Sequence, residues 1–176
     1  METKITILKP FFENPNKNFY IREVSKITGI NHTTIRQYLN KFVKESILFL
    51  EKQGLYPSYK LISSKKTLNL KLFFNLEKLR TSHLISYLEK EYDFPVIILF
   101  GSYAKAMDDK NSDIDLGLIS NIKKKDNLKK YEKILDKEIS IHKFTKRSWQ
   151  CAKIKNSRLI NNISNGIVLS GELEVI

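Results

Sequence analysis

The chain has 176 residues, enough for one ordinary domain or for two small ones. Its composition, with 41% hydrophobic and 28% charged residues, is that of a folded soluble protein and excludes a fibrous or disordered chain. The formal net charge of +12 favours a polyanionic partner, such as a nucleic acid, a nucleotide or an acidic lipid surface.

Cysteine use and hydropathy indicate the compartment. Cys151 is the single cysteine, which excludes an internal disulfide and a cysteine-based zinc site. No apolar stretch approaches the roughly 20 residues needed to span a bilayer, and the first residues lack the apolar core of a signal peptide. We therefore expect a cytoplasmic protein that does not associate with a membrane.

Two helices are predicted at the start of the chain. Residues 4–13 form the first, which ends at Asn14 because Pro15 excludes the helical conformation from the residue before it. Residues 21–28 form the second, whose apolar residues recur on one stripe. These apolar residues are Ile21, Val24 and Ile27.

A third helix follows a turn at Thr28-Gly29-Ile30, with Asn31 as its expected N-cap. Helical spacing gives it a buried side formed by Ile35, Leu39, Phe42 and Val43. Its opposite side is polar and carries Thr33, Thr34, Arg36, Gln37, Asn40 and Lys41. Two helices joined by a turn that contains glycine are typical of a helix-turn-helix.

A β-hairpin is predicted next, because the β-prone stretches 47–52 and 56–62 flank Gln53-Gly54-Leu55. Residues 1–63 resemble winged-helix transcription regulators, with YIREVSKITGINHTTIRQYLNKF as the helix-turn-helix and ILFLEKQGLYPSYKLI as the wing. The resemblance implies a domain that binds double-stranded DNA, usually as a homodimer on paired half-sites. The side chains expected to contact DNA are Thr33, Thr34, Arg36, Gln37, Lys41, Lys52 and Lys60. Winged helices also serve as protein-binding or dimerising modules, and that alternative stays open.

The pattern then changes to a helical linker and a second domain. Within a linker over 64–93, residues 66–92 are predicted to be helical, with a break at Thr81-Ser82 where Ser82 can cap a new helix. The apolar run 94–100 is bounded by Pro and Gly and is predicted to be a buried strand. A second strand begins near Ile114. The remaining predicted elements are a helix over 123–137, a strand over 139–144 and a helix over 158–165.

Two features of the run GSYAKAMDDKNSDIDLGL point to phosphate and metal chemistry. Gly101-Ser102 directly follows the buried strand and offers backbone N–H groups and a hydroxyl to a phosphate, at the start of a helix predicted over 103–107. Asp113 and Asp115 lie two apart on a strand, so both carboxylates project from one face. Mg²⁺ prefers one or two carboxylates together with substrate phosphates. The alternative is an ordinary turn followed by a strand boundary.

This run resembles the nucleotidyltransferase superfamily of DNA polymerase beta, and most closely its minimal prokaryotic members. The resemblance covers residues 94–144 and implies a small nucleotidyltransferase fold of α+β or α/β class over 94–176, with a mixed sheet and flanking helices. It implies that Gly101, Ser102 and Lys105 contact the nucleotide phosphates and that Asp113 and Asp115 bind the metal. Mg²⁺ and an NTP, expected to be ATP, would be the cofactor and substrate.

The chain departs from the family pattern at two points. It has Lys105-Ala106 where the family commonly has Arg-Gly, so the bidentate fork for phosphate is lost. Ser140 stands where active members have a third carboxylate, and serine accepts a proton poorly at neutral pH. On the same predicted strand face, Glu138 is a substitute catalytic carboxylate and His142 a second candidate base.

Two functions are consistent with these features. The first is Mg²⁺-dependent transfer of a nucleoside monophosphate from NTP to a hydroxyl of a protein or another acceptor, in an antitoxin-like protein that modifies a partner toxin. The second is a transcriptional regulator whose nucleotidyltransferase fold only binds nucleotide or dimerises. The role of the third carboxylate position separates the two functions.

Overall fold

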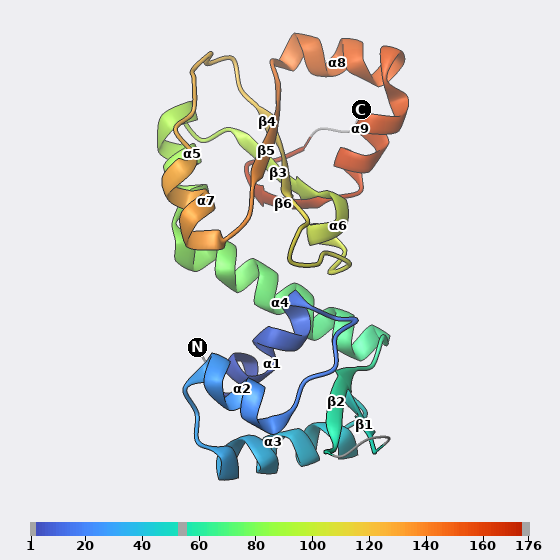
Figure 1. Ribbon diagram of the computed structural model, residues 1–176. Coiled ribbons are helices and arrows are strands. Elements are labelled where there is room, and N and C mark those ends of the chain that lie inside the picture. The colour runs from blue at the N-terminus through green and yellow to red at the C-terminus, as the bar shows by residue number, and fades with distance from the viewer. Residues whose placement is uncertain (1–2, 53–55, 174–176) are drawn as a thin grey trace. The chain divides into compact units, whose positions relative to one another are not determined.

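The computed structural model describes residues 3–52 and 56–173 (Figure 1). The chain divides into two compact units, Met1–Lys71 and Leu72–Ile176, with the division inside helix α4 (Lys65–Ser82). Within the described ranges, no helix is long and apolar enough to cross a membrane.

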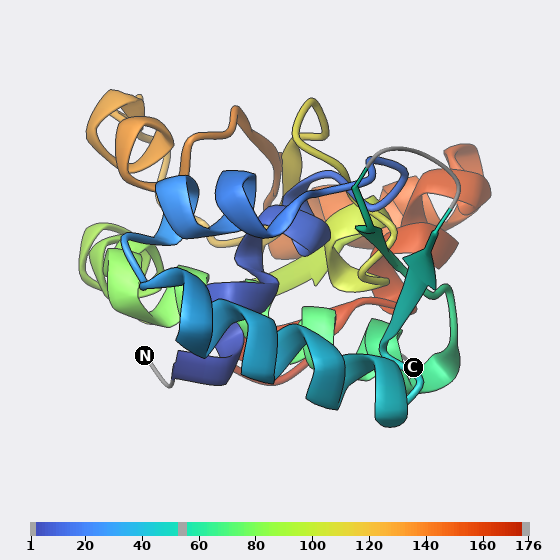
Figure 2. The same ribbon diagram turned by 60° about the horizontal axis from the view of Figure 1, so that its bottom comes forward.

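The first unit contains three helices and a hairpin among its described residues. They are α1 (Thr3–Glu13), α2 (Ile21–Thr28), α3 (His32–Lys44), β1 (Leu48–Glu51) and β2 (Ser58–Leu61). The two strands pair antiparallel, and the hairpin follows the C-terminal end of α3 (Figure 2). The predicted turn at Gln53-Gly54-Leu55 lies outside the described residues.

Local sequence signals explain how α2 gives way to α3. Gly29 adopts the left-handed conformation with φ of 71°, and its N–H donates to the carbonyl of Ser25, which ends α2. The Asn31 side chain accepts a hydrogen bond of 2.9 Å from the Thr34 N–H, so the predicted N-cap is confirmed.

The buried side of α3 is largely as predicted, since Ile35, Leu39 and Phe42 are fully buried. The expected stripe of α2 is wrong at Ile27, which is 54% exposed. The hairpin is joined to the segment before α2 by an antiparallel bridge in which Phe19 and Tyr59 exchange two backbone hydrogen bonds of 2.8 Å. Helical periodicity alone could not predict this bridge, because it joins residues far apart in sequence.

The second unit is built on a four-stranded mixed sheet in the order β5-β4-β3-β6. Strand β3 pairs antiparallel with β4 and β6, while β4 and β5 are parallel. The strands are β3 (Val96–Phe100), β4 (Ile114–Ile119), β5 (Ile139–Phe144) and β6 (Ile167–Ser170). The helices are α5 (Leu84–Tyr92), α6 (Gly101–Ala104), α7 (Lys129–Leu135), α8 (Lys146–Lys155) and α9 (Ser157–Ser164). The mixed sheet with flanking helices confirms that part of the predicted fold class.

Helices cover both faces of this sheet (Figure 1). Leu99 and Leu116 project to one face and pack in a core with Leu88 of α5 and with residues of α7. The other face packs against α8 and α9 in a second core. Its buried members are Ile98, Phe100, Ile119, Trp149, Ile160 and Ile163. The alternation of buried strand residues therefore serves two cores, as expected for strands covered on both sides.

The helices before β3 contribute directly to the first core. Leu79, at the end of α4, and Leu84 of α5 are buried in it. The break between α4 and α5 falls at His83, which has a φ of 61°, and Ser82 Oγ accepts a hydrogen bond of 3.2 Å from the Leu84 N–H. The residues predicted as a helical linker thus include part of the packed second unit.

Two local predictions for this unit need correction, and two elements were missed. The helix predicted over 103–107 begins at Gly101 and ends at Ala104, and the helix predicted over 123–137 is confined to Lys129–Leu135. Helix α8 and strand β6 were not predicted. The strand over 139–144 is confirmed.

Candidate nucleotide and metal site

The candidate site lies where β3 ends and β4 begins. Gly101 directly follows Phe100, the last residue of β3, and Phe100 pairs with Asp115 across the antiparallel ladder. The sheet therefore brings Gly101 and Asp115 together although fourteen positions separate them in sequence.

The backbone at Gly101 needs glycine for two reasons. Its φ of 74° lies in the left-handed region that side chains disfavour. A Cβ built on it would overlap Oδ2 of Asp115 and lie 3.2 Å from the carboxyl carbon. The missing side chain thus leaves room for the Asp115 carboxylate against the main chain.

The two aspartates flank a buried residue and differ in exposure. Ile114 is fully buried between them, while Asp113 is exposed and Asp115 is half-buried. Burial raises the pKa of the Asp115 carboxyl above its ordinary value; His142 acts against this rise and the Asp113 charge adds to it. Burial and a nearby like charge both disfavour the ionised form of this carboxyl group, and a bound cation would stabilise that form.

These residues fit a magnesium ion. Two carboxylates leave most of the coordination sphere to water and substrate phosphates, which is the arrangement Mg²⁺ prefers. Among the described residues, no three His, Cys, Asp or Glu side chains gather in a group that could hold a metal. The donor set here consists of Asp113 and Asp115.

Two polar residues of β5, Ser140 and His142, lie near these aspartates, as does Glu138, which directly precedes β5 and does not lie within it as predicted. Ser140 pairs with Asp115 in the parallel ladder, and Ile114 donates a backbone hydrogen bond of 2.9 Å to the carbonyl of Glu138. Glu138 and Asp113 both line a shallow groove of about 530 Å³. His142 follows two residues after Ser140, and its ring centroid lies 5.4 Å from that of Phe100.

Of the residues predicted to contact phosphates, Gly101 and Ser102 lie on the single turn of α6, and Lys105 directly follows it. The Ser102 carbonyl accepts hydrogen bonds of 3.2 Å from the Lys105 N–H and 2.9 Å from the Met107 N–H, which closes the turn. Ser102 is half-buried and Lys105 is exposed. The Lys105 side chain is therefore accessible to a phosphate in solvent.

Sequence reasoning missed Lys137, the last residue of the helix predicted over 123–137, whose side chain is only 5% exposed. Its ammonium group donates to the carbonyl of Ser112, the residue before Asp113, at 3.0 Å. A lysine near a helix end carries no sequence signal for such burial.

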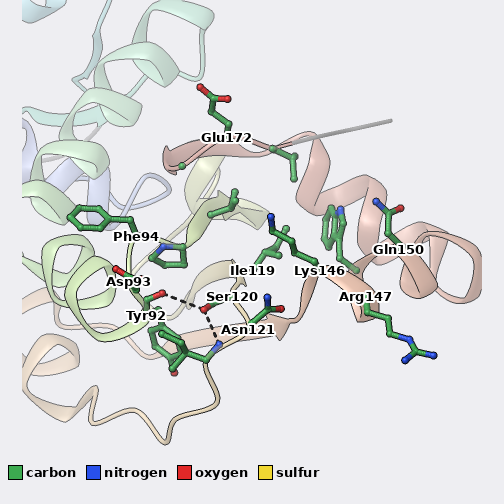
Figure 3. A pocket seen from close by; sticks show the side chains of 16 residues that line it. Tyr92, Asp93, Phe94, Ile119, Ser120, Asn121, Lys146, Arg147, Gln150 and Glu172 are labelled. Carbon is green, nitrogen blue, oxygen red and sulfur yellow. Dashed lines mark hydrogen bonds between the residues drawn. The ribbon is translucent and has the colours of Figure 1, made fainter.

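A separate cavity of about 680 Å³ lies at the other end of the sheet (Figure 3). It is lined by residues before β3 and after β4, and Ser120 Oγ donates a hydrogen bond of 3.3 Å to the Tyr92 carbonyl there. The Trp149 side chain also lines it, and its indole N–H has no partner among the described residues. This cavity does not contain the aspartates or Gly101.

The predicted DNA-contacting residues lie on α3 and beside or within the hairpin. Most are exposed, namely Thr33, Arg36, Gln37, Lys41 and Lys52, while Thr34 and Lys60 are half-buried. Lys41 Nζ lies 4.0 Å from a carboxylate oxygen of Glu45. A mostly apolar pocket of about 480 Å³ adjoins this surface and is lined in part by Tyr20, His32, Arg36 and Tyr56.

A Gly-Ser turn after a buried strand and two aspartates opening the next strand of a mixed sheet define a nucleotidyltransferase-type domain. The family described as "Polymerase beta, Nucleotidyltransferase" matches residues 82–172, just over half of the chain. The chain belongs to this family, whose general function is nucleotidyl transfer. No curated protein matches the chain.

Proposed function

We propose that the second unit is a Mg²⁺-dependent nucleotidyltransferase that transfers a nucleoside monophosphate from ATP to a hydroxyl of a partner protein. The observation that carries the proposal is the contact between Gly101 and the Asp115 carboxylate, with Asp113 on the adjoining loop. Asp113 and Asp115 would hold the ion. When bound, Mg²⁺ would polarise the phosphates and offset their charge.

The protein groups have separate roles in this proposal. Ser102, its neighbouring N–H groups and Lys105 bind and orient the phosphates. The acceptor hydroxyl attacks the α-phosphorus, pyrophosphate leaves, and a base takes the hydroxyl proton. Glu138 is the proposed base because it shares a groove with Asp113.

We further propose that the first unit binds double-stranded DNA as a winged helix and that the protein is a cytoplasmic homodimer. The exposed Arg36, Gln37 and Lys41 on α3 support this, because a recognition helix presents such side chains to the major groove. The whole protein would then be an antitoxin-like regulator that modifies its partner and binds its operator.

One observation favours a second candidate, a regulator that binds nucleotide without transferring it. Ser140, not a carboxylate, pairs with Asp115, and no third acidic side chain joins the described pair in a metal-binding group. Such a site would bind ATP with Mg²⁺ but lack part of the machinery for proton transfer.

Radiolabelling separates these candidates. The purified chain is incubated with each α-³²P-labelled NTP and Mg²⁺, with and without extract of the source cells, and separated on a gel. We expect a labelled protein band with ATP that is absent with EDTA and with Asp113→Asn. ATP binding without any labelled product would support the second candidate, and neither binding nor labelling would overturn both.

A further inference from the structure

The loop between α6 and β4 carries Asp113 and has no regular secondary structure. A small turn closes it: Asp109 Oδ1 accepts hydrogen bonds of 2.9 Å from the Asn111 N–H and 3.0 Å from Ser112 Oγ. Asp113 follows this turn immediately. The position of its carboxylate therefore depends on what holds the turn against the rest of the unit.

Lys137 anchors this turn to the rest of the second unit. Its ammonium group donates to the carbonyl of Asp109 at 2.5 Å and to that of Ser112 at 3.0 Å, so it joins both ends of the turn. It comes from the connection between α7 and β5. A lysine ammonium has three N–H donors, and two of them are used here on one loop.

A buried acid completes the network around Lys137. Asp108 Oδ2 lies 3.8 Å from Lys137 Nζ, and the two side chains are 4% and 5% exposed. Asp108 Oδ1 accepts a hydrogen bond of 2.8 Å from Asn75 Nδ2, which also donates to the Tyr103 carbonyl at 3.1 Å. The ring centroid of Tyr103 lies 5.8 Å from Lys137 Nζ. Polar networks in a low-dielectric interior are strong and fix one geometry when they are satisfied.

We propose that Lys137 is a positioning residue for the metal site, which holds Asp113 in the place where it binds Mg²⁺. The claim that Lys137 supports a metal site rests on the proposed function. The claim that Lys137 orders the loop does not. Hydrogen bonds fix the backbone on both sides of Asp113: the Ser112 carbonyl accepts one from the Lys137 ammonium, and the Ile114 N–H donates one to the Glu138 carbonyl. Residues that orient a metal ligand change metal affinity although they never touch the ion.

The test compares Lys137→Met, Lys137→Arg and Lys129→Met in the full chain. Lys129 is an exposed lysine of α7 that is not among the residues lining the groove with Asp113, so its replacement removes the same charge away from the loop. Two quantities are measured: amide hydrogen exchange of residues 105–113 in metal-free buffer, and Mn²⁺ affinity by electron paramagnetic resonance. Mn²⁺ serves as a spectroscopic substitute for Mg²⁺.

We expect Lys137→Met to speed exchange in the loop and to weaken Mn²⁺ binding by about 10- to 100-fold. Lys137→Arg keeps a cationic donor and should stay closer to wild type in both measurements, and Lys129→Met should match wild type. Folded Lys137→Met with unchanged loop exchange and unchanged Mn²⁺ affinity would overturn the proposal.

Two further outcomes are also informative. If Lys137→Met does not fold because the buried Asp108 carboxylate loses the Lys137 charge, the double variant Lys137→Met with Asp108→Asn removes both charges and decides by the same two measurements. If wild type binds no Mn²⁺, the proposed function fails. Loop exchange then still decides whether Lys137 orders the loop, since it is measured without metal.

Discussion

Gly101 and Asp115 lie so close together that a methyl group on Gly101 would overlap the Asp115 carboxylate. Gly101→Ala should therefore combine a strained left-handed backbone with a steric clash, at a cost of about 2–4 kcal/mol in free energy of unfolding. It should also weaken metal and nucleotide binding, because the carboxylate must move. Chemical denaturation of the second unit and Mn²⁺ titration measure the two effects.

Gly29→Ala is the matched control. Gly29 has nearly the same φ, 71°, but nothing lies within 4 Å of an ideal Cβ there. Gly29→Ala should lower the free energy of unfolding of the first unit only by the cost of the left-handed backbone conformation, about 1–2 kcal/mol, and should leave metal affinity unchanged. Equal losses of stability in the two variants would show that the clash with Asp115 has no energetic weight.

Stability should depend on pH through Asp115. Its pKa is raised in the folded protein, so its contribution to stability is full below the unfolded pKa and is lost as pH rises through the folded pKa. Asp115→Asn should therefore melt at a higher temperature than wild type at neutral pH in EDTA. The difference should shrink as pH falls and vanish below the unfolded pKa of an aspartate, about 3.9, where the carboxyl is protonated in both states. Calorimetry across this range checks it, and a less stable Asp115→Asn at neutral pH would refute the assignment.

The pairing of Ser140 with Asp115 predicts a gain of function. Ser140→Asp places a third carboxylate beside the pair and should raise nucleotidyl transfer, by up to about 10²-fold if proton transfer limits the rate. Glu138→Ala tests the competing arrangement, since it should abolish transfer only if Glu138 is the base. Single-turnover transfer rates for both variants are the measurement. If the wild-type protein transfers nucleotide rapidly and Ser140→Asp does not change the rate, the site does not need a carboxylate at position 140.

DNA binding by the first unit predicts a strong salt dependence. Arg36→Ala should weaken binding of duplex DNA by the full chain, and it should reduce the slope of log affinity against log salt because one phosphate or base contact is lost. Lys9→Ala removes one charge from an exposed position of α1 and serves as the control. Fluorescence anisotropy over a salt series compares them. Equal effects of the two variants would point to general charge attraction without a role for α3.

Much of the second unit could be predicted from local patterns. The spacing of Asp113 and Asp115 around an apolar residue predicts a strand with both carboxylates on one face, and Ile139 alternating with polar neighbours predicts β5. Ile114 and Ile139 are both buried. These patterns suffice because successive side chains of a strand point to opposite faces, so spacing along the chain alone assigns each residue to a face.

Elements that depend on distant contacts could not be predicted in this way. The lysine-rich start of the predicted helix over 123–137 is not helical, because the Lys124 carbonyl accepts hydrogen bonds from Tyr92 Oη and Lys143 Nζ. Asp126 accepts a further bond of 2.5 Å from the same tyrosine. In α8, Trp149 is the buried residue, so no apolar period marks the helix.

The residues of the candidate site divide in the same way, into those that local patterns predict and those that depend on distant contacts. Gly101, Ser102 and the two aspartates are adjacent in sequence to a recognisable strand, so their grouping follows from the motif. Lys137 lies far along the chain, and nothing in its surroundings distinguishes it from the exposed lysines of α7. Its burial results from contacts with distant residues, namely the carbonyls of Asp109 and Ser112 and the carboxylate of Asp108.

The central claim is a metal-dependent nucleotide site formed by Gly101, Asp113 and Asp115. Isothermal titration of ATP into the full chain, with Mg²⁺ and with EDTA, tests it most directly against the double variant Asp113→Asn with Asp115→Asn. We predict that Mg²⁺ strengthens ATP binding by wild type and has no effect on the folded double variant. Mg²⁺-dependent ATP affinity that is unchanged in that variant would contradict the claim.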